Sequence, residues 1–143
     1  MSGRVAGLAV KTGHRQPLEE AETVEIQETG IVGNVGQSDR RRVTLLSREQ
    51  WEQVQSELSM DLPWTTRRAN ILVEGMDLGS TLGKTILIGD VQLRVEGETH
   101  PCGLMDTYFE GLCQALVPEC RGGVHARVLG TGSVSLGDTI SVE

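Results

Sequence analysis

Short apolar stretches, several of them alternating with polar residues, recur along the chain and predict β-strands. A period of two residues places successive side chains on opposite faces of a sheet. Such stretches cover residues 4–10, 24–26, 43–47, 71–73, 86–95, 124–129 and 134–142. Eighteen glycines accompany them, and this combination predicts a mainly β fold with tight turns between short strands.

Two Gly-Asp pairs predict β-hairpins. Gly89 and Asp90 lie between two alternating stretches, and Gly137 and Asp138 lie between two others. A two-residue turn that begins with glycine is typical of an antiparallel hairpin. Two hairpins of this kind favour a small barrel or sandwich.

Two stretches have instead the three- and four-residue spacing of an amphipathic helix. In the first, Ser47 and Gln50 form a capping box ahead of an apolar face that runs to about Leu58. In the second, one helical face carries an apolar series that a proline ends: Met105, Tyr108, Phe109, Leu112 and Leu116. The sequence therefore predicts an α+β protein, mainly β with two or more peripheral helices.

Length and charge limit the class of protein. A chain of 143 residues is expected to form a single domain, residues 1–143, with a core that needs no disulfide or metal. The net charge of -7 argues against a general nucleic-acid or anionic-membrane binder. No apolar run approaches a membrane span or a signal sequence, so we expect a cytoplasmic protein. Three cysteines without a CxxC pair support neither a disulfide framework nor a zinc ribbon.

Cys102 is the main candidate for chemistry. It lies between Pro101 and Gly103, directly before the second predicted helix. The unpaired N–H groups and the positive dipole at a helix N-terminus favour a thiolate, which binds metals or attacks electrophiles. The alternative is a small buried residue with no chemical role.

Polar residues flank two of the predicted strands. Arg67, Arg68 and Asn70 lie at the entrance of the strand at residues 71–73, where they either converge on a barrel mouth or form an ordinary strand start. In the strand that begins at Val124, His125 is expected to point away from the core because it alternates with apolar residues. The preceding Gly122 would let a ligand or another backbone approach closely.

Other sites have weaker support. A zinc site would draw its ligands from Cys102, His100, Cys113, Cys120 and His125, but the spacing of His100 and Cys102 is too short to be typical and Cys113 can equally face the core. A Cys-His hydrolase would need one of these histidines within hydrogen-bond reach of the thiol. The run from Arg40 to Arg42 is either a solvated charge run or a set of donors for an anionic ligand.

Five motifs in sequence order resemble the MOSC domain family, which is found at the C-terminus of molybdenum cofactor sulfurases and in amidoxime-reducing enzymes. The motifs run from about Gly30 to Asp138 and read GIVGN, RRVTLLSRE, RRANILVEGMDL, IGDVQLRVEGETHPC and ALVPECRGGVHARVLGTGSVSLGD. The resemblance implies a compact β-barrel with peripheral helices.

The resemblance also implies a pterin-based molybdenum cofactor (molybdopterin) whose metal is bound by a single cysteine, and Cys102 matches that cysteine. A soft thiolate suits a metal that cofactor sulfurs already hold. The cofactor phosphate calls for Arg side chains and backbone N–H groups. The residues that match the family motifs as candidates for cofactor binding are Arg68, Asn70, Arg121, Gly122 and His125.

Two functions of different class follow from the resemblance. One is an oxidoreductase component that reduces N-hydroxylated substrates with electrons from a separate donor protein. The other is a carrier, independent of pyridoxal phosphate, that delivers the cofactor or a cysteine-bound sulfur to an acceptor protein. Asn34 stands where many relatives have Asp, which adds the alternative of a barrel that has lost the cofactor. The N-terminal β-domain of the amidoxime-reducing members is also missing, so any substrate pocket is expected to be more open or to be completed by a partner.

Overall fold

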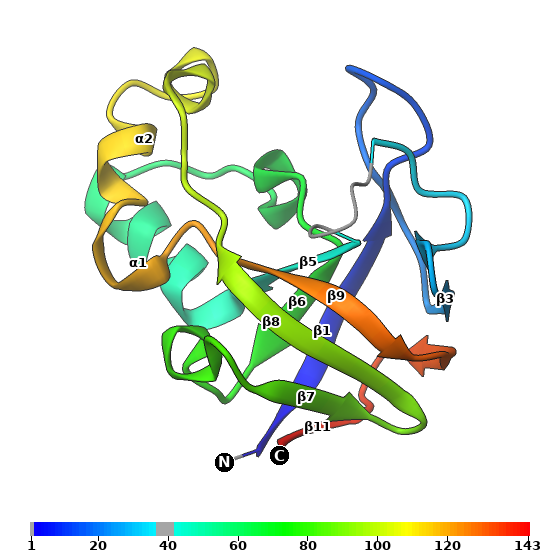
Figure 1. The fold of residues 1–143 in the computed structure, drawn as a ribbon. Helices are drawn as coiled ribbons and strands as arrows, with labels where there is room; N and C mark the ends of the chain where they lie inside the picture. The colour runs from blue at the N-terminus through cyan, green and yellow to red at the C-terminus, as the bar shows by residue number, and fades with distance from the viewer. Residues whose placement is uncertain (1, 37–41) are drawn as a thin grey trace.

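The computed structural model describes residues 2–36 and 42–143. Within these residues, seven strands form a closed barrel in the order β11-β7-β8-β9-β5-β6-β1, and pairing of β11 with β1 completes the ring (Figure 1). The barrel strands are β1 (Ser2–Val10), β5 (Val43–Ser47), β6 (Ile71–Glu74), β7 (Thr85–Ile88), β8 (Val91–Glu98), β9 (Val124–Gly130) and β11 (Thr139–Val142). The predicted mainly β barrel is therefore confirmed.

The alternating pattern of the barrel strands places one set of side chains in the core. In β8, Val91, Leu93 and Val95 are fully buried while the residues between them are exposed. Ile88 pairs with Val91 across the Gly89-Asp90 turn, as the sequence predicts. The core cluster also takes in apolar residues from each of the other barrel strands, so the hydrophobic pattern itself sets which face of each strand turns inward.

A second, smaller sheet changes the expected position of the C-terminal hairpin. It consists of β10 (Gly132–Ser135), β3 (Thr23–Gln27) and β4 (Gly30–Ile31), and a short β2 (Glu19–Glu20) pairs with β1. The turn at Gly137 and Asp138 exists, since Asp138 Oδ2 accepts from Ser135 N at 2.8 Å. However, β10 pairs with β3 while β11 pairs with β1 and β7. The predicted hairpin is therefore wrong, because alternation specifies burial and not the partner strand.

Helix α1 (Arg48–Leu58) connects the parallel strands β5 and β6 and confirms the first helix prediction. Ser47 Oγ accepts from Gln50 N at 3.2 Å, which is the N-cap half of the predicted capping box. The Gln50 side chain instead donates to Glu119 O at 2.8 Å. Trp51 and Val54 on the inner face of α1 are buried in a second apolar cluster outside the barrel.

The second predicted helix is broken into short pieces. They are the 3-10 helix η3 (Gly103–Thr107) and α2 (Leu112–Ala115). Three further 3-10 helices are η1 (Trp64–Arg67), η2 (Leu78–Thr81) and η4 (Pro118–Cys120). Gly111 has φ +90 between η3 and α2, which is a glycine conformation that ends a helix. Asp106 Oδ1 accepts from Cys113 N at 2.9 Å and so caps the first turn of α2. In the described residues, no helix has the length and apolar character needed to traverse a bilayer.

Candidate functional site

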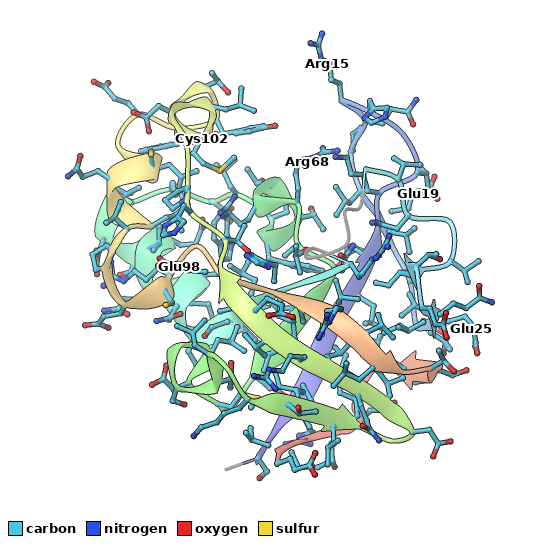
Figure 2. The ribbon with its side chains drawn as sticks, in the orientation of Figure 1. Arg15, Glu19, Glu25, Arg68, Glu98 and Cys102 are labelled. Carbon is cyan, nitrogen blue, oxygen red and sulfur yellow. The ribbon has the colours of Figure 1, made fainter. Side chains whose placement is uncertain are left out.

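Two segments rise from one end of the barrel, the loop after β1 and the segment that contains η3 (Figure 1). Figure 2 shows Cys102 on the η3 segment, Arg15 on the other segment and Arg68 between them. A hollow of about 300 Å³ lies here, lined by Arg15, Gln16, Pro17, Leu18, Pro63, Thr65, Thr66, Arg68 and Tyr108.

Cys102 is solvent-exposed, so the alternative of a small buried residue is wrong. Its backbone is extended at the N-cap of η3, and its carbonyl oxygen accepts from Met105 N at 3.0 Å. Met105 is buried in the second apolar cluster and anchors this turn. A Cβ added at Gly103 would meet no atom within 4 Å. The thiol is therefore reachable beside an open space, although η3 is too short to supply the dipole of the long helix that the sequence predicts.

Arg67 holds the segment that leads to Cys102. Its Nη2 donates to Thr99 O at 2.7 Å and its Nε donates to Gly122 O at 3.0 Å. A Cβ at Gly122 would lie 2.5 Å from Thr99 O and 3.2 Å from Arg67 Nη2. The lack of a side chain at Gly122 thus lets the Thr99 backbone and the Arg67 guanidinium approach closely. Approach of another backbone is one of the two possibilities that the sequence raises for Gly122, and approach of a ligand is the other. The sequence does not mark Arg67 as a cofactor-binding candidate, because two adjacent arginines do not reveal which of them binds backbone oxygens of another segment.

Arg68 lines the hollow with one donor unused by the protein. Its Nη1 donates to Gln16 O at 2.8 Å, while its buried Nη2 has no hydrogen-bond partner among the described residues. The residue also has a left-handed backbone with φ 63, which is costly for a non-glycine residue and is common at functional sites. An orphaned guanidinium N–H in a hollow is suited to an anionic oxygen.

Asn70 directly precedes β6 and links β5, β1 and the turn at Asn34. Its Oδ1 accepts from Thr44 N and Thr44 Oγ1, each at 3.1 Å. Its Nδ2 donates to Ala9 O at 3.2 Å and to Asn34 Oδ1 at 3.0 Å. Asn34 Oδ1 also accepts from Lys11 N at 2.7 Å. The side chain of Asn70 is buried, and these bonds brace the barrel end beneath the hollow.

Arg121 and His125 are buried away from the residues that line the hollow. The guanidinium of Arg121 forms a bidentate pair with Glu57, with both N–O distances 3.0 Å, and also donates to Ala115 O at 3.1 Å. His125 pairs with Thr44 and lies over Gly97, where an added Cβ would come within 3.0 Å of its Nε2. Arg121 therefore ties α1 to α2, and His125 fills the outer surface of the sheet.

Three further sequence predictions concern the Arg40–Arg42 run, a metal site and Tyr108. Arg40 and Arg41 lie outside the described residues, and Arg42 Nη1 donates to Thr29 O at 3.5 Å. Within residues 2–36 and 42–143, no three His, Cys, Asp or Glu side chains are grouped so that they could hold a metal ion. Tyr108, which the sequence places on a buried helix face, is instead 45% exposed and lines the hollow. The helix break at Gly111 explains this difference.

Comparisons with known proteins agree with this architecture. The chain is similar in structure to the YUAD protein from Bacillus subtilis, with a TM-score of 0.85 and 22% identity over 99% of this chain and 96% of that one. YiiM from Geobacillus stearothermophilus gives a TM-score of 0.80 and 14% identity over 99% and 75% of the two chains. YiiM from Escherichia coli gives 0.76 and 16% over 100% and 70%.

At these identities the solved structures show the fold alone. No match to the chain was found among curated proteins. The model of the MOSC domain matches residues 32–141, which is most of the chain. The match begins just before Asn34 and includes Cys102, Arg68 and Asn70. On this match, the protein belongs to the MOSC domain family.

Proposed function

We propose that this chain binds the molybdenum cofactor with Cys102 as the protein ligand of the metal, and that it is the cofactor-binding component of an oxidoreductase. The MOSC family is associated with this cofactor. The observation that carries the proposal is an exposed thiol at Cys102 on the same segment as Tyr108. Tyr108 lines the same hollow as Arg68, whose Nη2 has no hydrogen-bond partner among the described residues.

The residues present fit the cofactor in chemical type. A thiolate is a suitable ligand for a soft metal that other sulfurs also bind. Arg68 Nη2 offers an unsatisfied donor for a phosphate oxygen, and Arg15 adds a second positive charge to the same hollow. Tyr108 presents an aromatic face beside them, against which a flat ring can pack.

When bound, the cofactor would supply a metal that exchanges two electrons. Reduction of an N-hydroxylated compound to its N–H form takes two electrons and two protons and releases water. The electrons come from a separate donor protein in this proposal. The chain's own part is to orient the metal through Cys102, which Arg67 holds in place through Thr99 and Gly122, and to bind the anionic end through Arg68.

The exposure of Cys102 favours a second function, delivery of the cofactor or of a cysteine-bound sulfur. An exposed thiol at the N-cap of a five-residue helix is accessible to the cysteine or cofactor site of an acceptor protein. In this case Arg68 and Tyr108 would hold the cargo only until the acceptor binds. The exposed Leu104, two residues after Cys102, gives such an acceptor an apolar contact beside the thiol.

Molybdenum content tests the binding proposal. The wild type, Cys102→Ser and Cys113→Ser would each be produced in a host that makes the cofactor and in one that does not, and analysed for molybdenum per folded chain. We expect metal in the wild type and in Cys113→Ser from the first host only, and none in Cys102→Ser. Equal metal in the two serine variants would refute ligation by Cys102.

Turnover separates the two functions. The metal-loaded protein would be given a reductant and a hydroxylamine compound, and the N–H product would be measured. Product formation that Cys102→Ser abolishes supports the oxidoreductase. Transfer of sulfur from a Cys102 persulfide to an acceptor, with no reduction of the hydroxylamine, supports the carrier instead.

A further inference from the structure

A second and larger hollow lies on the side of the barrel, between the first turn of α1, the loop before η2, and η4. Its volume is about 690 Å³, within the range of ligand pockets. The residues that line it are Ser47, Glu49, Gln50, Gly75, Met76, Asp77, Gly79, Glu119 and Cys120. None of them lines the hollow at Arg68, so the proposed function leaves this space unused.

Among the described residues, the wall of this hollow is rich in acceptors and includes no cationic side chain. Glu49, Asp77 and Glu119 contribute three carboxylates. Asp77 Oδ1 accepts from Gly79 N, and Glu49 Oε2 accepts from Gly75 N, each at 3.1 Å, which leaves acceptor capacity on both groups. The local potential is therefore negative, and it favours a ligand that carries positive charge.

Cys120 reports the same negative potential. Burial raises the pKa of its thiol, and the carboxylates of Glu98 and Asp77 raise this pKa further. Figure 2 shows Glu98 at the end of β8. The Cys120 thiol therefore stays protonated and contributes a neutral, polarizable surface to the hollow rather than a nucleophile.

Gln50 provides an acceptor that the protein does not use. Its Nε2 donates to Glu119 O at 2.8 Å, and this bond fixes the amide between α1 and η4. Its Oε1 is buried and has no partner among the described residues. A buried acceptor without a donor is destabilising, and an N–H group of a ligand would satisfy it.

The shape and chemistry of the remaining wall favour an organic cation over a metal ion. No set of three ligating side chains exists for a metal within the described part of the chain. Met76 and Cys120 instead present sulfur and hydrocarbon, which suit an aromatic or aliphatic body. Glu119 and Cys120 also have consecutive left-handed backbones, with φ 55 and 57, a kind of strain that gathers at ligand sites.

We propose that this hollow binds a small organic cation, an amidinium or ammonium group on an apolar body. Asp77, Glu119 and Gln50 hold the charged head, and Met76 and Cys120 contact the body. The site is separate from Cys102, so cation binding is independent of molybdenum.

Calorimetric titration of the full chain with three probes of one shape tests the charge requirement. Benzamidinium is expected to bind, whereas neutral benzamide and anionic benzoate bind at least about tenfold more weakly. Equal binding of the three, or no binding of benzamidinium at millimolar concentration, would overturn the proposal.

Charge-removing variants test the residues. Asp77→Asn keeps the oxygen that accepts from Gly79 N, and Glu119→Gln keeps the backbone bond to Gln50, so both should fold. Each is expected to weaken benzamidinium binding by about tenfold. Glu110→Gln, which removes the same charge at an exposed position outside the hollow, should bind like the wild type. Equal affinity in all three variants would show that the carboxylates do not hold the cation.

A filled hollow is the last test. A Cβ at Gly79 would lie 3.4 Å from Asp77 Oδ1 and 3.6 Å from Cys120 Sγ, which are ordinary contacts. Gly79→Val extends two methyl groups from this Cβ and is expected to abolish benzamidinium binding. Unchanged affinity in a folded Gly79→Val protein would place the probe elsewhere and refute the site. If this variant does not fold, Gly79→Ala with its smaller side chain gives the same test through a partial loss of affinity.

Discussion

Arg67 Nη2 donates to the carbonyl oxygen of Thr99 at 2.7 Å, and this contact joins η1 to the segment that carries Cys102. The same guanidinium reaches Gly122 O. The two backbone segments at Thr99 and Gly122, which precede and follow η3 and α2, are therefore held together by one planar cation. A forked donor suits this task better than an ammonium group.

Arg67→Ala is expected to lower the free energy of unfolding by about 2 kcal/mol, because two charge-assisted hydrogen bonds to backbone oxygens are lost. Urea denaturation measures the change. Arg94→Ala, at an exposed position of β8, should change stability by less than about 0.5 kcal/mol. A similar small loss in Arg67→Ala would mean that the segment is held by its apolar contacts alone.

Arg121 is expected to act on stability through Glu57. Arg121→Ala should cost about 2 kcal/mol and Glu57→Gln about 1 kcal/mol, because the Glu57 side chain is 45% exposed and water replaces part of the interaction. A double-mutant cycle in urea measures the coupling between the two residues. Loss of molybdenum from Arg121→Ala without loss of stability would instead assign Arg121 to the cofactor.

Asn34→Asp is expected to be tolerated, with a change in unfolding free energy below about 1 kcal/mol. Asn34 Oδ1 accepts from Lys11 N and Asn70 Nδ2, and a carboxylate oxygen can accept both bonds. Asn34→Ala leaves these donors without their acceptor and should cost about 1 to 2 kcal/mol. Thermal or urea unfolding distinguishes the two variants. An equal loss in both would show that the charge, rather than the missing oxygen, is what the site rejects.

The alkaline stability of the protein is expected to depend on Cys120. Burial, Glu98 and Asp77 raise the pKa of this thiol in the folded state above its ordinary value of 9.0. Between the ordinary and the raised pKa, the unfolded chain loses a proton that the folded chain keeps, so the free energy of unfolding falls as pH rises. Below the ordinary pKa both states hold the proton and the term does not change.

Cys120→Ser removes the pH-dependent contribution of this thiol to the free energy of unfolding. The difference in unfolding free energy between wild type and variant should be constant from about pH 7 to about pH 8 and should shrink toward about pH 10. Comparing the two proteins cancels the titration of other groups. Parallel curves across the whole range would contradict the raised pKa of Cys120.

The sequence predicts the strands well where one face is buried. In β8 the alternation of Val91, Leu93 and Val95 specifies both the strand and its inward face, and Gly89 specifies the turn before it. The sequence does not predict which strands pair when the partner strand lies far away in the chain. Val134 and Ile140 are both core residues, but only the completed fold shows that their strands enter different sheets.

The same limit applies to the candidate site. The position of Cys102 before a helical segment could be predicted, but the break at Gly111 could not, because Met105, Leu112 and Leu116 keep their helical spacing and are all buried. Arginine side chains are long and reach partners that no local pattern reveals. Arg67 and Arg68 are neighbours in sequence, yet Arg67 donates to the backbone around the Cys102 segment, whereas Arg68 donates to Gln16 O and lines the hollow.

The pairing of β1 with β11, in which Ser2 lies opposite Ser141, has a consequence for biosynthesis. Figure 1 shows the first and last strands side by side. While the ribosome is still translating, β1 and β7 lack their common neighbour, and each exposes unpaired N–H and C=O groups. The ring can close only when residues 139–142 are free to pair with both β1 and β7, so we expect the nascent chain to remain vulnerable to aggregation until these residues have emerged from the ribosome.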